Sequence, residues 1–297
     1  MSTAARYLVF VRERFPPGAY LPLICVFVAA GYIPSAASSG AAPLPLPYAV
    51  AALVVTAAFL HLRLVDEVKD AEVDRLGRPG RPLPRGLVTE RELARGAGGL
   101  LVLAIALAAT LGVGPLVGFL PAAVYILLAD AEFFAPDRIH RNLVVYALVH
   151  SPVVPLLLVF AWWASPTATP SAALAGLVLL GWGVGLGLEV ARKTYAPDEE
   201  GPGLETYSSA LGRPGAVWLA AGSLAAGMLG GALYAGLAGA GPVAIAAALV
   251  VSGVILAGGF GLRDARRRTI ETVGTAVGFA ILLWPIGVAL AIGGARP

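Results

Sequence analysis

Nine apolar segments, each about long enough to cross a lipid bilayer, constrain this chain more than any other feature of its sequence. A membrane-spanning helix needs about 20 predominantly apolar residues. Only 13% of the 297 residues are charged, against about 25% in an ordinary soluble domain. The sequence therefore predicts an all-α, polytopic integral-membrane domain over residues 1–297, a bundle of nine transmembrane helices. The predicted spans are residues 18–36, 46–64, 97–113, 115–130, 143–163, 171–191, 214–238, 242–260 and 272–293.

The charged residues gather on one side of this predicted topology. Of the 21 Lys and Arg residues, only Arg296 falls on the other side, and all 18 Asp and Glu residues lie on the charged side or within a few residues of it. The positive-inside rule then predicts a multi-pass protein of the cell membrane with a cytoplasmic N-terminus and an external C-terminus. Acidic residues contribute little to orientation, so their position favours chemistry at this face. The alternative is that the loops on this side are simply longer and more polar.

The loop between the second and third spans carries a cluster of carboxylates. Asp66, Glu67, Asp70 and Asp74 lie within one arc of about 100° if a helix continues from the second span. Like charges four residues apart destabilise a helix, whereas Mg²⁺ binds carboxylates and bridges to substrate phosphates. The cluster therefore indicates a metal site, with a solvated helix end neutralised by Lys69 and the following arginines as the alternative.

Arginines follow this acidic cluster at once, in a stretch stiffened by Pro79, Pro82 and Pro84. Guanidinium groups bind phosphate oxygens in a fork geometry, so an adjacent metal site and these arginines suit a diphosphate. A basic patch on anionic lipid is the alternative. The arginines are Arg75, Arg78, Arg81 and Arg85.

The loop between the sixth and seventh spans holds a second cluster of acids and bases. Glu189 lies at the end of an apolar segment, where an ionisable residue indicates function, with Arg192 or Lys193 as its expected partner. Three further acids, Asp198, Glu199 and Glu200, follow Pro197. An intrahelical salt bridge followed by a solvated turn is the alternative reading.

These two loops resemble the signatures of the UbiA-type superfamily of intramembrane aromatic prenyltransferases. The first signature, N-D-x-x-D-x-x-x-D followed by R-P-x-P-x-G, matches residues 66–74 and 81–86, with Asp66 for Asn and Glu67 for the first Asp. The second signature, a Lys-Asp-x-x-Asp-type run followed by G-x-x-T and a terminal Gly, matches Lys193, residues 203–206 and Gly212. Thr194 follows the lysine where the family has aspartate.

The resemblance implies a bundle around a central cavity open to the cytoplasmic side, where Mg²⁺ and basic groups ionise an allylic prenyl diphosphate. The prenyl group would pass to an aromatic or other lipophilic acceptor within the membrane. Asp70, Asp74 and Lys193 are the expected catalytic residues, and Tyr195 and Tyr207 are expected to contact the acceptor or shield the cation. Expected metal ligands are Asp66, Glu67, Asp70, Asp74, Glu189, Asp198, Glu199 and Glu200, with Asp198, Glu199 or Glu200 expected to hold a second Mg²⁺ ion. Expected diphosphate ligands are Arg75, Arg78, Arg81, Arg141, Arg192 and Lys193.

Three alternatives to this reading remain open. A membrane terpene cyclase or a transferase with an isoprenoid acceptor would use the same ionisation. A transporter would place ionisable groups near the bilayer midplane on broken helices, whereas the predicted midplanes here carry no charge. A loop salt-bridge network is the alternative for Arg141. The expected partners are a prenyl diphosphate, a lipophilic acceptor and membrane lipid, and not nucleic acid.

Overall fold

A computed structural model describes residues 2–139, 141–201 and 204–294 of the chain. Within these residues the protein is helical and has no strand. Gly203 of the second signature and Arg296 lie outside the described residues. The helices are α1 (Thr3–Arg14), α2 (Pro17–Ser38), α3 (Pro45–Lys69), α4 (Ala71–Gly77), α5 (Glu90–Thr110), α6 (Val113–Asp130), α7 (Pro136–Ile139), α8 (Leu143–His150), α9 (Val153–Trp163), α10 (Leu174–Arg192), α11 (Tyr207–Leu237), α12 (Pro242–Gly261) and α13 (Arg267–Gly294).

The described residues contain nine helical segments that are long and apolar enough to cross a membrane, which confirms the predicted number. The fifth segment, Leu143–Trp163, is divided between α8 and α9 at Ser151 and Pro152. The third begins earlier than its apolar run indicates, because Thr89 and Glu92 form a capping box at the start of α5. Polar first turns of this kind extend a helix beyond its apolar part.

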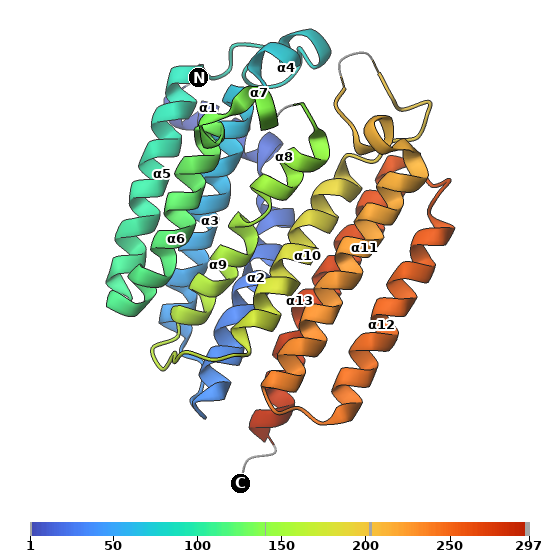
Figure 1. The fold of residues 1–297 in the computed structure, drawn as a ribbon. Coiled ribbons are helices and arrows are strands. Elements are labelled where there is room, and N and C mark those ends of the chain that lie inside the picture. Colours follow the sequence, from blue (N-terminus) through green and yellow to red (C-terminus); the bar gives the residue numbers. More distant parts are fainter. Residues whose placement is uncertain (1, 140, 202–203, 295–297) are drawn as a thin grey trace.

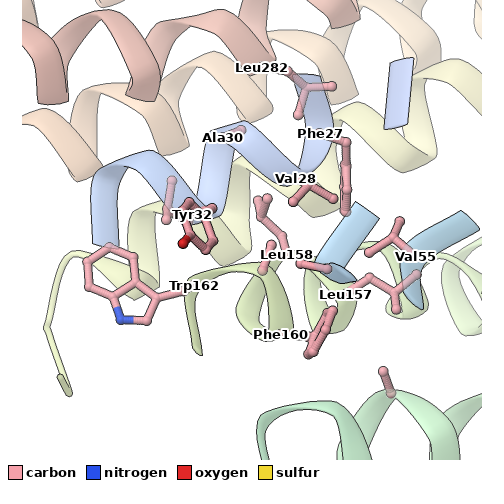
Figure 2. Packing of buried hydrophobic residues seen from close by; sticks show 14 of the residues in the cluster. Phe27, Val28, Ala30, Tyr32, Val55, Leu157, Leu158, Phe160, Trp162 and Leu282 are labelled. Carbon is pink, nitrogen blue, oxygen red and sulfur yellow. The ribbon is translucent and has the colours of Figure 1, made fainter. Parts of the chain in front are cut away.

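The helices run roughly side by side, and the described ends of the chain lie at opposite ends of the bundle (Figure 1). Helix α2 packs against α3, α9 and α13 and so joins the first half of the chain to the second. Figure 2 shows the core at this place, where Phe27 and Val28 of α2 meet Leu157 and Leu158 of α9. Val28, Leu157 and Leu158 are completely buried. The cluster around these residues is apolar, although single polar side chains such as Ser223 and Ser252 are buried within α11 and α12.

Helices α10 and α11 pack at backbone distance because glycines line both surfaces. A Cβ atom added to Gly183 would lie 2.3 Å from the backbone nitrogen of Gly227, and one added to Gly176 would lie 2.3 Å from that of Tyr234. Small residues of this kind allow close helix packing in membranes, where van der Waals contact drives association. The close packing fixes the end of α10 relative to the start of α11.

The predicted continuous helix through the acidic cluster is wrong in one respect. Helix α3 ends at Lys69, Asp70 lies between the two helices, and α4 begins at Ala71. The amide of Asp70 still donates to the carbonyl of Asp66 at 2.9 Å, and that of Asp74 to the carbonyl of Asp70 at 2.8 Å. The chain therefore bends at Asp70 without losing its helical hydrogen bonds, and the four carboxylates part into different environments.

Two apolar cavities lie on the side of the bundle formed by the last helices. One, of about 860 Å³, is lined by residues of α12 and α13 that include Ala247, Leu283 and Trp284. The other, of about 470 Å³, lies among α10, α11, α12 and α13 and is lined by residues that include Leu224 and Val273. The acidic residues at the end of α3 line neither of them. The central cavity that the family resemblance implies stays a prediction.

Candidate active site

The end of α3 presents two carboxylates to solvent at the charged end of the bundle. Asp66 and Asp70 are both exposed, and the Asp66 carboxylate interacts electrostatically with Asp70. Desolvation and then the nearby Asp74 carboxylate raise the pKa of Asp70, while Lys193, Arg81 and Arg78 act in the opposite direction. Two exposed carboxylates one helical turn apart are suited to share a cation.

The Glu67 carboxylate lies on another side of α3 and forms ion pairs with two arginines. Its Oε1 accepts from Arg14 Nε at 2.6 Å and from Arg63 Nη2 at 2.6 Å, and its side chain is only 1% exposed. Arg14 ends α1 and Arg63 is one turn earlier on α3. Glu67 therefore joins α1 to α3, a role that the sequence pattern did not reveal.

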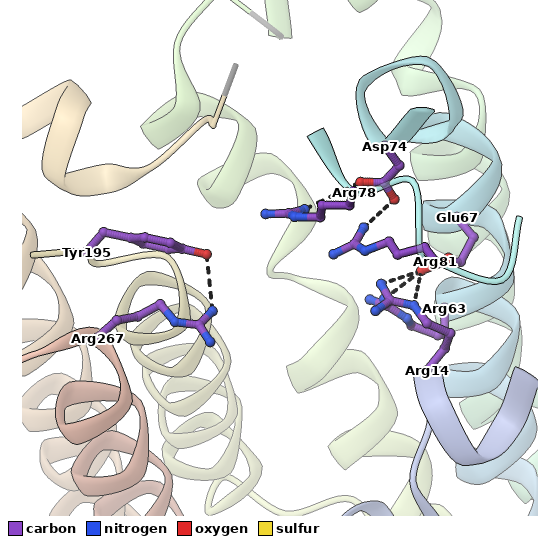
Figure 3. Close-up of polar contacts among 8 residues, drawn as sticks. All are labelled: Arg14, Arg63, Glu67, Asp74, Arg78, Arg81, Tyr195 and Arg267. Carbon is purple, nitrogen blue, oxygen red and sulfur yellow. Dashed lines mark hydrogen bonds and ion pairs between the residues drawn. The ribbon is translucent and has the colours of Figure 1, made fainter. Parts of the chain in front are cut away.

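Asp74 of α4 holds two arginines of the loop that follows it. It forms ion pairs with Arg81 and, at 3.5 Å, with Arg78, and its side chain is 2% exposed. Figure 3 shows the guanidinium groups of Arg78 and Arg81 extending from this loop toward the side where Tyr195 lies. The ion pairs thus fix the direction in which two cationic groups are presented.

The loop from Arg81 to Gly86 owes its shape to local hydrogen bonds and one apolar anchor. The amide of Arg85 donates to the carbonyl of Arg81 at 3.1 Å, and Gly86 has a φ of +75°, which favours glycine. Leu83 is 8% exposed and belongs to the same buried cluster as Phe10 of α1. The family-type R-P-x-P-x-G stretch therefore forms a fixed loop that positions Arg81.

The end of α10 supplies the opposite half of the candidate site. Glu189 Oε2 accepts from Arg192 Nη2 at 2.6 Å, and its Oε1 lies 3.1 Å from Lys193 Nζ. The Asp66 carboxylate of α3 interacts electrostatically with Glu189 and Arg192, and the Asp70 carboxylate with Lys193. The two charged helix ends, more than 100 residues apart in the sequence, therefore act on each other in the folded protein.

The three acids after Pro197 have other contacts. Asp198 pairs with Arg266 at 3.0 Å, and both side chains are more than 60% exposed. Glu199 accepts from the backbone amides of Ala196 and Arg267, at 2.9 and 2.8 Å, and these bonds hold the pKa of Glu199 below its usual value. Glu200 accepts from the hydroxyl groups of Thr206 and Ser208. Each of the three is thus part of the loop structure.

The two predicted acceptor tyrosines lie in different environments. The Tyr195 hydroxyl accepts from Arg267 Nη1 at 3.1 Å, and the Arg267 guanidinium lies 5.0 Å from the Tyr195 ring centroid (Figure 3). Tyr207 is completely buried, and its amide donates to the Lys193 carbonyl at 3.0 Å. Tyr195 is therefore at the surface of the site, and Tyr207 supports the turn after α10 from within.

Two of the predicted diphosphate ligands are exposed side chains. Arg75 pairs with Glu90 of α5 at 2.6 Å, and its side chain is 56% exposed. Arg141 is exposed in the turn before α8. Their part in binding a diphosphate stays a prediction.

The sequence pattern did not single out Tyr146 of α8, which lies among the charged groups. Lys193 Nζ lies 5.9 Å from the Tyr146 ring centroid, and the Tyr146 side chain interacts electrostatically with Asp66, Glu189 and Asp70. The ring of His150 stacks on that of Tyr146 at 3.9 Å. The one available signal was its position, four residues before His150 at the charged end of the fifth span.

Lys69 makes its direct contacts with the end of α6 and not with the acids beside it. Its Nζ donates to the Ala129 carbonyl at 2.8 Å and to the Glu132 carboxylate. In the same region His61 Nε2 lies 2.9 Å from Asp130 Oδ2. These contacts tie α3 to the end of α6, although Lys69 still acts electrostatically on the Asp66 carboxylate.

The side chains at this end fit one Mg²⁺ ion better than a cluster of several ligands. Among the described residues, no three acidic, His or Cys side chains converge on one point. Mg²⁺ binds through one or two carboxylates, several waters and substrate phosphate oxygens. Asp66 and Asp70 meet that requirement, whereas Glu67 and Asp74 are buried against arginines.

The fold and these charged helix ends define a polytopic membrane protein with a candidate anion and metal site at one end. The sequence model of the UbiA prenyltransferase family matches residues 23–273, so the chain belongs to the UbiA prenyltransferase family. No curated protein is matched by the sequence.

Solved structures share the fold at low sequence identity. A structure of digeranylgeranylglyceryl phosphate synthase in membranes is similar with a TM-score of 0.67 and 16% identity, over 98% of this chain and 100% of that one. An apo UbiA homologue from Aeropyrum pernix K1 is similar with a TM-score of 0.65 and 16% identity, over 92% and 98%. A UbiA homologue from Archaeoglobus fulgidus bound to GPP and Mg²⁺ is similar with a TM-score of 0.60 and 15% identity, over 96% and 99%.

Proposed function

We propose that this protein binds an allylic prenyl diphosphate with Mg²⁺ at its charged end, ionises it and transfers the prenyl group to a lipophilic acceptor. The observation that supports it most is that acidic and basic side chains are held together at two helix ends: Asp74 forms an ion pair with Arg81 beyond the end of α3, and Glu189 lies 3.1 Å from Lys193 at the end of α10. The charges of Arg192 and Lys193 also act on Asp66 and Asp70, respectively. A diphosphate with a bound cation needs this combination of carboxylates and basic groups. The fold neighbour from Archaeoglobus fulgidus binds GPP and Mg²⁺.

In this proposal, one set of residues binds the cation, a second set binds the diphosphate, and a third set orients the basic side chains of the second. Asp66 and Asp70 would hold Mg²⁺, which would supply electrostatic stabilisation of the charge on the leaving diphosphate. Arg81 and Lys193 bind the diphosphate oxygens. Asp74 orients Arg81 through its ion pair, and Glu189 orients Lys193 from 3.1 Å. Fixed cations of this kind stabilise developing negative charge without reorganising.

The reaction breaks the bond between the allylic carbon and the diphosphate oxygen, and the electron pair leaves with the diphosphate. The basic groups named above stabilise that leaving group. In this proposal the prenyl chain lies against the apolar helices, which limits capture of the allylic cation by water. A ring or alkene of the acceptor then forms the new carbon–carbon bond and loses a proton.

Diphosphate release from purified protein tests this function. The full chain is incubated in detergent with Mg²⁺ and geranyl, farnesyl or longer prenyl diphosphates, with and without aromatic acceptors. We expect Mg²⁺-dependent diphosphate release that Asp70→Ala abolishes and Glu72→Ala, an exposed acid of the neighbouring turn, leaves unchanged. Release without any acceptor, together with a cyclic product, would identify a cyclase. Release that persists in Asp70→Ala would overturn the proposed site.

A further inference from the structure

The second half of the site lacks a carboxylate at the position where the family signature has one. Thr194 follows Lys193 there. Its side chain is completely buried, and its hydroxyl donates to the Val190 carbonyl one turn earlier at 2.8 Å. A threonine turned into its own helix end offers no negative charge to a cation.

The nearby acids do not replace it. Glu200 accepts from Ser208 Oγ at 2.6 Å and from Thr206 Oγ1 at 2.8 Å, which closes the loop between α10 and α11. Glu199 binds two backbone amides and so joins this loop to the start of α13. Asp198 is 61% exposed beside Arg266. Moving Glu199 or Glu200 to a metal would break the hydrogen bonds that hold the loop, at a cost for each donor left unsatisfied.

Basic groups occupy the end of α10 instead. Lys193 and Arg192 flank Glu189, so this set carries a net positive charge, and the two basic side chains are 28% and 47% exposed. A third basic side chain, Arg267, donates to the Tyr195 hydroxyl two residues after Lys193 (Figure 3). Arg192 acts electrostatically on Asp66, and Lys193 on Asp70, so the end of α10 offers these carboxylates two cations and one acid, Glu189.

From this geometry we infer that the site works with one Mg²⁺ ion per diphosphate, held by Asp66 and Asp70, and that Lys193 and Arg192 neutralise the part of the diphosphate that a second ion would otherwise bind. The inference rests on the proposed function. It assigns Asp198, Glu199 and Glu200 to the loop structure. It also predicts that the turnover rate rises with magnesium concentration along the saturation curve of a single binding site.

Counting bound metal tests the inference without using activity. The full-length protein in detergent is dialysed to equilibrium against Mn²⁺ and inorganic pyrophosphate, and the excess of manganese and pyrophosphate on the protein side is measured per chain. We expect close to equal amounts of manganese, pyrophosphate and protein. Asp70→Ala should lose the manganese, whereas Asp198→Asn and Glu200→Gln should keep the wild-type ratio.

Other ratios of bound manganese to bound pyrophosphate would contradict the inference. A wild-type manganese count twice the pyrophosphate count, reduced by half in Glu200→Gln or Asp198→Asn, would overturn the single-ion inference and leave the proposed function standing. No bound manganese or pyrophosphate in the wild-type protein would overturn both. Lys193→Ala should weaken pyrophosphate binding at least tenfold while the metal-to-pyrophosphate ratio of the bound fraction stays the same, and a changed ratio would contradict the role given to Lys193.

Discussion

Glu67 should support stability and not metal binding, and replacing it tests how the acidic residues divide their roles. Its side chain is 1% exposed, and one oxygen accepts from both Arg14 and Arg63. Removing one partner of a buried ion pair costs about 3–5 kcal/mol, because the other charge stays buried without compensation. For a protein of this size, that loss lowers the unfolding temperature on the order of 10 °C.

The assay compares Glu67→Ala with two neighbours. Thermal unfolding is followed by tryptophan fluorescence in detergent, and metal binding by Mn²⁺ titration of the folded protein. We expect Glu67→Ala to unfold at a much lower temperature and, below that temperature, to bind Mn²⁺ as the wild type does. Asp70→Ala should show the opposite behaviour. Glu72→Ala, an exposed surface change, should shift stability by no more than about 0.5 kcal/mol. Normal stability with lost Mn²⁺ binding in Glu67→Ala would refute this reasoning.

Two further predictions concern stability, and one concerns the candidate site. Gly183→Ala should lower the unfolding temperature by the equivalent of about 1–3 kcal/mol, because its Cβ would lie 2.3 Å from the Gly227 nitrogen, while Gly222→Ala, with nothing within 4 Å, should not. Asp70→Asn should raise the unfolding temperature at pH 7 without Mg²⁺. The raised pKa of Asp70 makes its charged form costly, so the gain should vanish as the pH falls below the ordinary aspartate pKa of about 3.9. Arg81→Gln should raise the KM for the prenyl diphosphate at least tenfold in the release assay, and an unchanged KM would exclude contact.

The sequence predicts the number of membrane-spanning helices well, because apolar length is a local property that the bilayer enforces. The turn at Gly112, where φ is +115° and α6 begins one residue later, was also readable from the glycines and proline around it. Apolar length alone predicts the fifth span as one segment, although Pro152 signals the division between α8 and α9. The capping box that extends α5 was likewise a local signal.

The candidate site was predictable only in part. The helical arc placed the four acids together, but the partners of Glu67 and Asp74 depend on how α1 and the loop after α4 fold back on α3. Arg14 is 53 residues from Glu67, and no periodicity connects them. The proximity of Asp66 to the end of α10 likewise depends on tertiary packing through α2, which contacts α3 on one side and α13 on the other. Residue type and spacing indicate a chemistry, whereas the pairing of charges requires the folded chain.

Mg²⁺-dependent binding of pyrophosphate, measured by titration calorimetry on the wild type and two single variants, tests most directly whether both helix ends bind one ligand. We predict that the wild-type protein binds pyrophosphate only with Mg²⁺ present. Asp70→Ala, directly after α3, and Lys193→Ala, directly after α10, should each weaken binding at least tenfold, which corresponds to about 1.4 kcal/mol. Wild-type affinity in either variant would show that the two ends do not share a ligand and would contradict the proposed site.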